Sequence, residues 1–151
     1  MKIAFTIFLV FWVSQGSAQE SEKEAVKKTI ETFFEGFHRQ DSLMIRQTVD
    51  QNIILQTIGN DSLGNVIVHT EVFSDFLKSI VSIPDSTLFQ EVIKSFSIQV
   101  DGPMANAWTP YDFMLNGSFH HCGVNSFQLV KDHEQWNIIY LIDTRRKDGC
   151  E

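Results

Sequence analysis

The chain has 151 residues, of which 19 are acidic and 12 are Lys or Arg, and its formal net charge is −7 at pH 7. A chain of this length predicts a single domain. The acidic charge argues against a protein that binds nucleic acid without sequence preference, because such a protein needs a basic surface. A hydrophobic content of 43% argues against disorder. The thirteen Phe, three Trp and two Tyr residues fit either a well-filled core or an aromatic-lined cavity.

Residues 1–18 have the three parts of a secretory signal peptide. Lys2 provides a positive start, residues 3–13 form an apolar run, and small residues precede a cleavage site after Ala18. The apolar run is shorter than the ~20 residues that a membrane-spanning helix needs. We therefore predict that residues 19–151 form one domain, which is periplasmic or secreted and is not held in a membrane after cleavage.

The two cysteines of the chain, Cys122 and Cys150, both lie in the predicted mature domain. Disulfides persist outside the cytoplasm, so export favours a bridge between them. The bridge would attach the C-terminal tail to the last strands. The alternative is one partly buried thiol and one free thiol in the tail. A catalytic cysteine is less expected, because no Cys-x-x-Cys motif surrounds either residue.

Helical periodicity dominates the start of the predicted domain. Ser21 and Glu24 have the spacing of a capping box, which predicts that the first helix begins there. Asp41 predicts the N-cap of a short second helix. The apolar face of the first helix is formed by residues at helical spacing, namely Val26, Ile30, Phe33, Phe34 and Phe37.

A short hairpin and a third helix are expected next. Residues 53–55 and 66–68 read as two strands, and the Gly- and Asn-rich segment 59–65 reads as the turn between them. Thr70 is a candidate N-cap for the third helix, which Pro84 would end.

The second half of the chain has the alternation that is typical of strands. Four strands are predicted at residues 92–100, 104–115, 118–131 and 136–145. Asp101-Gly102 and Asn116-Gly117 are dipeptides that favour hairpin turns between them. Helices followed by long antiparallel strands indicate an α+β fold in which N-terminal helices pack on a strongly curved antiparallel sheet.

The order of these elements resembles the nuclear-transport-factor-2-like superfamily, also called SnoaL-like or the cystatin-like cone. The end of the first helix and the last two strands carry the resemblance, in residues 33–41, 123–130 and 136–139. Residues 107–111 and 140–146 are similar to an exported bacterial branch. The resemblance implies a cone that encloses a pocket between the curved sheet and the helices. It also implies that a homodimer could form through the open face of the sheet.

Strand parity predicts which residues of 119–129 face this pocket. His121 and Asn125 share a parity with Phe119, Phe127 and Leu129. Gly123 lies between them and would let the strand bend or a ligand approach. The opposite face, which includes Cys122, is expected to be solvated. A buried imidazole beside a buried amide could hold a ligand or shuttle a proton. Equally, the two side chains could form a structural hydrogen-bonded pair.

Further candidates lie on the neighbouring strands. Trp108 and Tyr111 flank Pro110, and with Tyr140 they are candidates for the pocket wall or for ordinary core. Asp112 is a candidate base, although a surface carboxylate is the more common role.

Asp143 and Arg145 share a parity on the last strand and could pair at the rim of the cone. An arginine at that position could bind a carboxylate. The alternative is a solvated salt bridge that contributes little to stability.

No metal site is predicted. His120 and His121 are adjacent, so on a regular strand they would point to opposite faces and could not share an ion. The remaining histidines, His38, His69 and His133, lie in separate segments without ligand spacing.

Two main functions remain open. The first is the binding of a small organic ligand in an aromatic-lined cone. The second is a cofactor-free lyase, isomerase or hydrolase with His121 as base and Asp112 and Tyr140 as further candidates. The resemblance implies this option, because relatives such as ketosteroid isomerase and scytalone dehydratase work without cofactors. A dimerising interaction module is a third option.

Overall fold

The computed structural model describes residues 11–150. The first ten residues of the predicted signal peptide lie outside this range. The described elements are α1 (Phe11–His38), α2 (Ser42–Arg46), β1 (Val49–Asn60), β2 (Val66–Glu71), α3 (Phe73–Val81), β3 (Phe89–Ile93), β4 (Ser97–Asp101), β5 (Met104–Leu115), β6 (Ser118–Asp132) and β7 (Gln135–Arg146). None of the described helices combines the length and apolar character that crossing a membrane requires.

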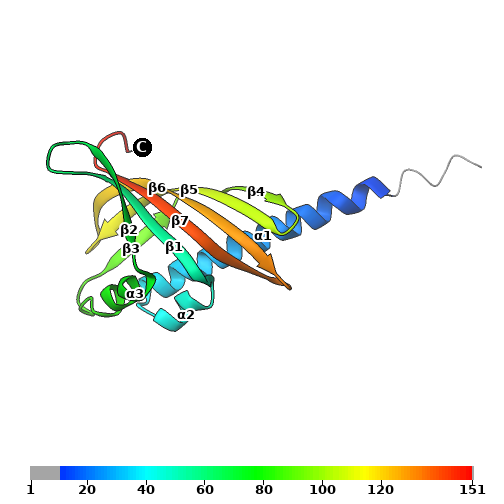
Figure 1. The fold of residues 1–151 in the computed structure, drawn as a ribbon, viewed down its shortest axis with the longest axis horizontal. Helices are drawn as coiled ribbons and strands as arrows, with labels where there is room; N and C mark the ends of the chain where they lie inside the picture. The colour runs from blue at the N-terminus through cyan, green and yellow to red at the C-terminus, as the bar shows by residue number, and fades with distance from the viewer. Residues whose placement is uncertain (1–10, 151) are drawn as a thin grey trace, which may run out of the picture.

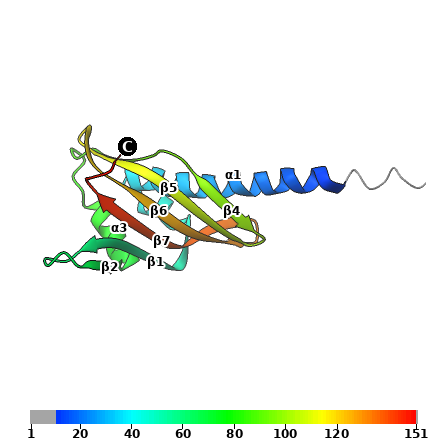
Figure 2. The ribbon, with the colours of Figure 1, turned by 90° about the horizontal axis from the view of Figure 1, so that it is seen from above.

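The sheet has seven strands in the order β2-β1-β7-β6-β5-β3, and β4 also pairs with β5. All strand pairs are antiparallel except β1 with β7, which is parallel. The predicted α+β fold is therefore confirmed, with a mixed rather than purely antiparallel sheet. The long helix α1 runs along one face of the curved sheet, and its N-terminal part projects past the sheet edge (Figures 1 and 2).

The three long strands β5, β6 and β7 match their predicted ranges to within a residue or two. The predicted strand 92–100 is wrong, because the structure has two strands there, β3 and β4, which both pair with β5. Pro110 of β5 lies opposite the break and has no amide N–H to donate. Its carbonyl accepts a hydrogen bond from Lys94 N at 2.8 Å, between the two ladders.

Of the three predicted helix starts, the structure confirms one and contradicts two. Asp41 is the N-cap of α2, and its Oδ1 accepts from the amides of Leu43 and Met44 at 3.0 Å each. The prediction for Ser21 is wrong in this chain, because α1 is already helical ten residues earlier. The prediction for Thr70 is also wrong. β2 continues through it, and Val72 occupies the N-cap position of α3.

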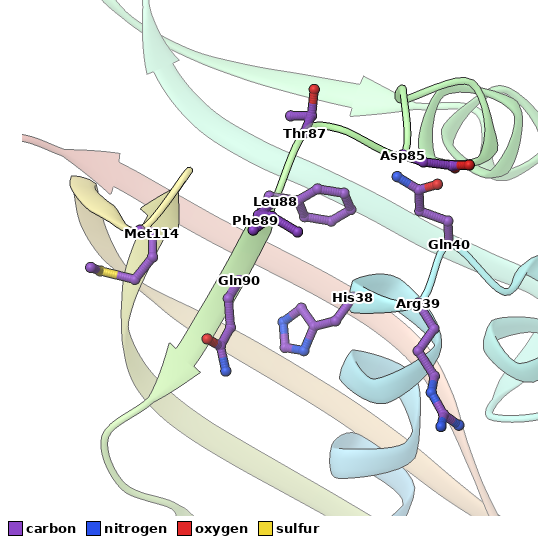
Figure 3. A pocket seen from close by; sticks show the side chains of 10 residues that line it. His38, Arg39, Gln40, Asp85, Thr87, Leu88, Phe89, Gln90 and Met114 are labelled. Carbon is purple, nitrogen blue, oxygen red and sulfur yellow. The ribbon is translucent and has the colours of Figure 1, made fainter.

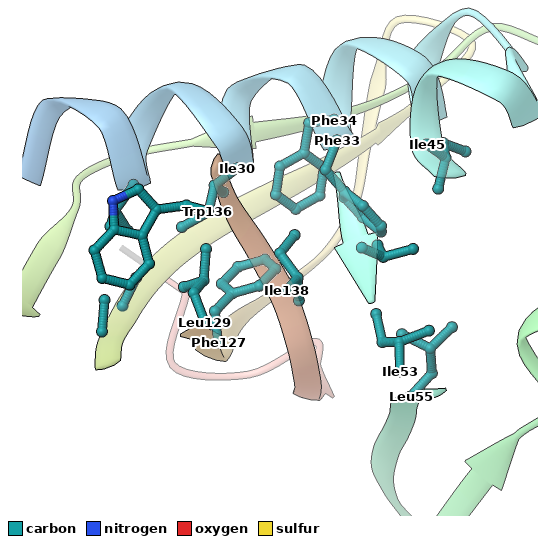
Figure 4. Close-up of a cluster of buried hydrophobic side chains, with 14 of the residues drawn as sticks. Ile30, Phe33, Phe34, Ile45, Ile53, Leu55, Phe127, Leu129, Trp136 and Ile138 are labelled. Atoms are coloured by element: carbon teal, nitrogen blue, oxygen red, sulfur yellow. The ribbon is translucent and has the colours of Figure 1, made fainter. Parts of the chain in front are cut away.

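The core lies between α1 and the sheet (Figure 4). Phe33 and Phe34 of α1 pack edge-on against Phe127 of β6, with ring centroids 6.4 and 6.1 Å apart. Ile30 of α1 and Ile138 of β7 are fully buried in the same cluster. Much of the aromatic content of the chain is thus core packing, although part of this cluster also borders a cavity.

Cys122 and Cys150 form a disulfide in this structure, with Cα atoms 5.8 Å apart. Cys122 is only 3% exposed, although its side of β6 was expected to be solvated. Cys150 of the C-terminal tail is disulfide-bonded to Cys122 and covers it. The bridge therefore attaches the tail to the central strand of the predicted meander.

Candidate functional site

A cavity of about 70 Å³ lies between α1 and the sheet. Its walls combine aromatic side chains from the helices with charged and polar side chains from the strands. The lining consists of Phe33, Phe34, Phe37, Leu55, Gln56, Thr57, Glu71, Phe76, Glu91, Asn125, Leu141, Asp143 and Arg145. In this cavity a wall of several phenylalanines meets a group of ionisable side chains.

Strand register explains why the polar residues meet. Asn125 of β6 lies directly opposite Asp143 of β7, and Asp143 is in turn paired with Thr57 of β1. The three positions form one row across the inner face of three strands. Asn125 and Asp143 are buried, with 3% and 9% of their surfaces exposed.

Glu91 approaches this row from the edge strand β3. Its Oε1 accepts a hydrogen bond from Nδ2 of Asn125 at 2.5 Å. Burial raises the pKa of the Glu91 carboxyl to about 8, and the negative charge of Asp143 adds to the rise, against the opposing effects of Asn125 and Arg145. Glu91 is therefore largely a neutral carboxylic acid at pH 7, and it can donate as well as accept a hydrogen bond.

Asp143 is held by two neighbours. Its Oδ2 accepts from Arg145 Nε at 2.8 Å and from the Tyr111 hydroxyl at 3.4 Å. The same hydroxyl donates to the carbonyl of Thr144 at 3.0 Å. Burial and the carboxylates of Glu91 and Asp143 raise the pKa of Tyr111. The pair of Asp143 and Arg145 that parity predicted is thus formed and borders the cavity.

The structure separates the other sequence-predicted residues. Asn125, Asp143 and Arg145 line the cavity. Tyr111 is 1% exposed and reaches the site through its contact with Asp143. Tyr140 donates its hydroxyl proton to Oε1 of Gln56 at 2.6 Å, and Gln56 borders the cavity.

Two candidates lie elsewhere. Trp108 is 54% exposed and has the strand parity opposite to that of the buried residues of β5. It is therefore on the outer face of the sheet and is not a pocket wall. Asp112 also has this outer parity, and its Oδ2 lies 3.5 Å from Nζ of Lys94. Neither residue is in position to act in the cavity.

His121 differs most from its predicted surroundings. Its ring stacks on Phe113 with centroids 4.7 Å apart, and its Nδ1 lies 2.8 Å from Nδ1 of His120. Asn125 bonds to Glu91 rather than to His121. Within residues 11–150, no carboxylate forms a hydrogen bond with His121 and the cavity lining does not include it. Burial lowers the pKa of His121, and the nearby charge of Arg145 lowers it further.

The expectation that His120 and His121 point to opposite faces is wrong. A shift in the register of β5 and β6 falls at this point, where Phe113 pairs with His121 and Met114 pairs with Phe119. The bulge takes His120 out of the regular alternation and lets the two rings meet. Across the described part of the chain, no group of three or more His, Cys, Asp or Glu side chains is arranged to hold a metal ion.

Sequence reasoning missed Glu91, which is the most perturbed carboxyl of the described chain. The signal was present, because Phe89, Glu91 and Ile93 share a parity and the two apolar members pack in or against the core. In a continuous strand over residues 92–100, the apolar residues Val92, Ile98 and Val100 share the even parity, which would place Glu91 on the opposite face. The break opposite Pro110 changes that assignment.

A second, more open cavity of about 480 Å³ lies beyond His38 (Figure 3). Its walls come from the end of α1, from the segment that leads into β3 and from the hairpin between β5 and β6. This cavity is larger, but the hydrogen-bonded carboxyls Glu91 and Asp143 lie in the smaller one. We therefore place the candidate site in the smaller cavity.

No protein-family model matches the chain, and no curated protein matches its sequence. Solved structures do match its fold. An NTF2-like protein with a cystatin-like fold from Novosphingobium aromaticivorans has a TM-score of 0.71 and 11% identity, covering 96% of this chain and 94% of its own. An NTF2-like protein of Pseudomonas putida has a TM-score of 0.70 and 9% identity, with 86% and 90% coverage.

A Streptomyces avermitilis protein of the NTF2-like family, provisionally named a dehydratase, matches with a TM-score of 0.62 and 13% identity. The alignment covers 84% of this chain and 97% of that protein. Identities this low establish the fold alone. With its N-terminal helices on a curved seven-stranded sheet, the chain has the NTF2-like, cystatin-like fold that its sequence resembles.

Proposed function

We propose that this protein binds a small organic molecule in the cavity between α1 and the sheet. The observation that carries the proposal is the meeting of an aromatic wall with the hydrogen-bonded pairs Glu91–Asn125 and Asp143–Arg145. Ligand sites are typically apolar cavities with a few precisely placed polar groups. Phe34 of α1 would contact the apolar part of the ligand, while the two pairs would orient a polar group.

The size of the cavity constrains the ligand. Its volume is about 70 Å³. Sites for drug-sized ligands are usually ~300–1,000 Å³. The enclosed part of the ligand is therefore only a few atoms, unless α1 and the edge strand β3 move apart on binding.

A second candidate is cofactor-free acid–base catalysis at the same place, with Glu91 as the proton donor or acceptor. The specific observation in its favour is that burial raises the pKa of Glu91 to about 8, close to neutral pH, where a group exchanges protons efficiently. The provisional name of the Streptomyces avermitilis protein is consistent with such chemistry on this fold. Glu91 replaces His121 in this role, because His121 lies outside the cavity lining within the described residues.

We also propose that the mature protein is exported and that it can form a homodimer. The disulfide between Cys122 and Cys150 supports an oxidising compartment for the mature protein. The exposed Trp108 on the outer face of the sheet supports a homodimer through that face.

Native mass spectrometry of the protein, produced in a bacterial host with its complete N-terminal segment, tests these points together. We expect a chain that begins at Gln19 and carries a bound small molecule, and the assembly mass reports whether it is a dimer. Asn125→Ala should lose the molecule, because it removes the partner of Glu91. Ser126→Ala changes the next residue on the same strand, on the outer face, and should retain it.

Equal ligand occupancy in the Asn125 and Ser126 variants would contradict the placement of the site. The captured molecule then separates the two candidate functions. If the protein only binds the molecule, the molecule is recovered chemically unchanged after incubation with the protein over pH 6–9. An enzyme converts it with a rate that depends on a group with a pKa near 8, and Glu91→Gln abolishes the conversion.

A further inference from the structure

The backbone of β3 is held at Glu91 by a side chain from α1. β3 lies at one end of the strand order, so its outer edge has no neighbouring strand in the described sheet. The Glu91 N–H donates a hydrogen bond to Nε2 of His38 at 2.9 Å. A backbone N–H can only donate, so Nε2 must present its lone pair. The imidazole in this contact is therefore neutral, with its proton on Nδ1.

The position of the His38 ring is fixed by aromatic neighbours on the same helix. Its centroid lies 6.1 Å from that of Phe34, with the ring planes 27° apart, and 5.7 Å from that of Phe37. Both phenylalanines line the candidate site. The helix that forms the aromatic wall of the cavity thus also carries the acceptor for the amide of Glu91.

We propose that His38 is a positioning residue for Glu91. Its unprotonated Nε2 holds the backbone of β3 at the point where the Glu91 side chain enters the cavity. This inference rests on the proposed function, because it assigns a role to a residue that serves that site. Without the acceptor, the edge of β3 can move away from α1, and the carboxyl of Glu91 moves with it.

The same contact makes the site sensitive to acid. Protonated His38 has no acceptor and its Nε2–H would oppose the Glu91 N–H, so the hydrogen bond is lost. Burial lowers the pKa of His38, which keeps the ring neutral at pH 7. The charged residues that line the same cavity as His38 are Arg39 on α1 and Asp85 on the loop before β3, and Glu91 contacts the ring through its backbone N–H. The open cavity beside His38 gives water access to it (Figure 3).

Amide hydrogen exchange measured by NMR tests the inference without any ligand. The variants are His38→Phe, which keeps an aromatic ring but has no acceptor, and His38→Gln, which has a carbonyl acceptor that does not titrate. At pH 7 the protection factor of the Glu91 amide should fall roughly five- to tenfold in His38→Phe, since one hydrogen bond is lost. It should remain near the wild-type value in His38→Gln.

As the pH is lowered below the ordinary histidine value of 6.5 and through the lowered pKa of His38, the protection of this amide should fall in the wild type and stay constant in His38→Gln. Amides of β6 serve as internal references for the general stability of the fold. Equal protection of the Glu91 amide in the wild type and His38→Phe at pH 7 would overturn the inference. So would a His38→Gln protein with the same acid dependence as the wild type.

The two proposals fail separately. If the exchange results are as expected but native mass spectrometry finds no bound molecule, the proposed function fails and the positioning contact stands. If a molecule is bound and lost in Asn125→Ala, while the Glu91 amide is unaffected by His38→Phe, the proposed function stands and the role of His38 fails.

Discussion

Glu91→Gln is expected to stabilise the protein in alkaline solution. The native carboxyl keeps its proton up to a pKa of about 8, whereas the unfolded chain releases it near the ordinary value of 4.5. The native state therefore binds more protons between these pH values, and the free energy of unfolding of the wild type falls as the pH rises through this window. Glutamine removes this loss and can still accept the hydrogen bond from Asn125.

The expected gain is near zero at pH 4 and grows to a limit above pH 8. The shift of the Glu91 pKa corresponds to at most about 4–5 kcal/mol of unfolding free energy at that limit. Urea denaturation of the wild type and variant at pH 4, 6 and 9 measures it. Glu24→Gln is a matched control on the exposed side of α1 and should show no such pH dependence. A gain that is the same at all three pH values would contradict a buried protonated carboxyl.

The strands and turns of this fold could be predicted from the sequence because the residues that determine them lie a few positions apart. Asn116-Gly117 sets the hairpin between β5 and β6, and Gly117 has the positive φ of 77° that such a turn requires. Asp41 caps α2 through its own neighbouring amides. A cap or a tight turn depends on residues a few positions apart, so the sequence contains the whole interaction.

The candidate site depends on register between distant segments, and only part of it could be predicted. The pairing of Asp143 with Arg145 and the inward direction of Asn125 follow from the alternation within one strand. Glu91 meets Asn125 only because β3 and β6 both pair with β5 in a particular register. The local sequence does not determine that register, so the contact between Glu91 and Asn125 could not be predicted.

Irregularities in the strands account for the misplaced residues. A bulge at His120 brings two histidine rings together that strict alternation would separate. The break opposite Pro110 reverses the parity of the segment that contains Glu91. The bulge moves one side chain out of the alternation and the break reverses a whole segment, so a single unrecognised irregularity is enough to misplace a predicted functional group.

Gly123→Ala is expected to be the most damaging single substitution in the sheet. A Cβ at this position would lie 1.8 Å from the carbonyl oxygen of Thr144 and 2.7 Å from the hydroxyl of Tyr111. Tyr111 pairs directly with Gly123 across β5 and β6, and its side chain covers the glycine. The glycine thus makes room for an aromatic side chain and for a backbone carbonyl.

The carbonyl of Thr144 cannot withdraw without disturbing the pairing of β6 with β7. We expect a loss of more than ~4 kcal/mol of unfolding free energy, or failure to fold, as for other severe backbone clashes. Gly59→Ala is the matched control, because a Cβ there meets no atom within 4 Å and Gly59 is also in a strand. Urea denaturation compares the two.

If the Gly123→Ala protein folds, its effect on the candidate site can be measured in addition to its effect on stability. Its alanine would displace the Tyr111 hydroxyl from Asp143 and Thr144, the two groups to which that hydroxyl now donates. Asp143 would then depend on Arg145 alone, and ligand retention in native mass spectrometry should fall together with stability. A Gly123→Ala protein as stable as Gly59→Ala would show that the β6–β7 pair can absorb the extra carbon. The close approach of Tyr111 would then not be what requires glycine at this position.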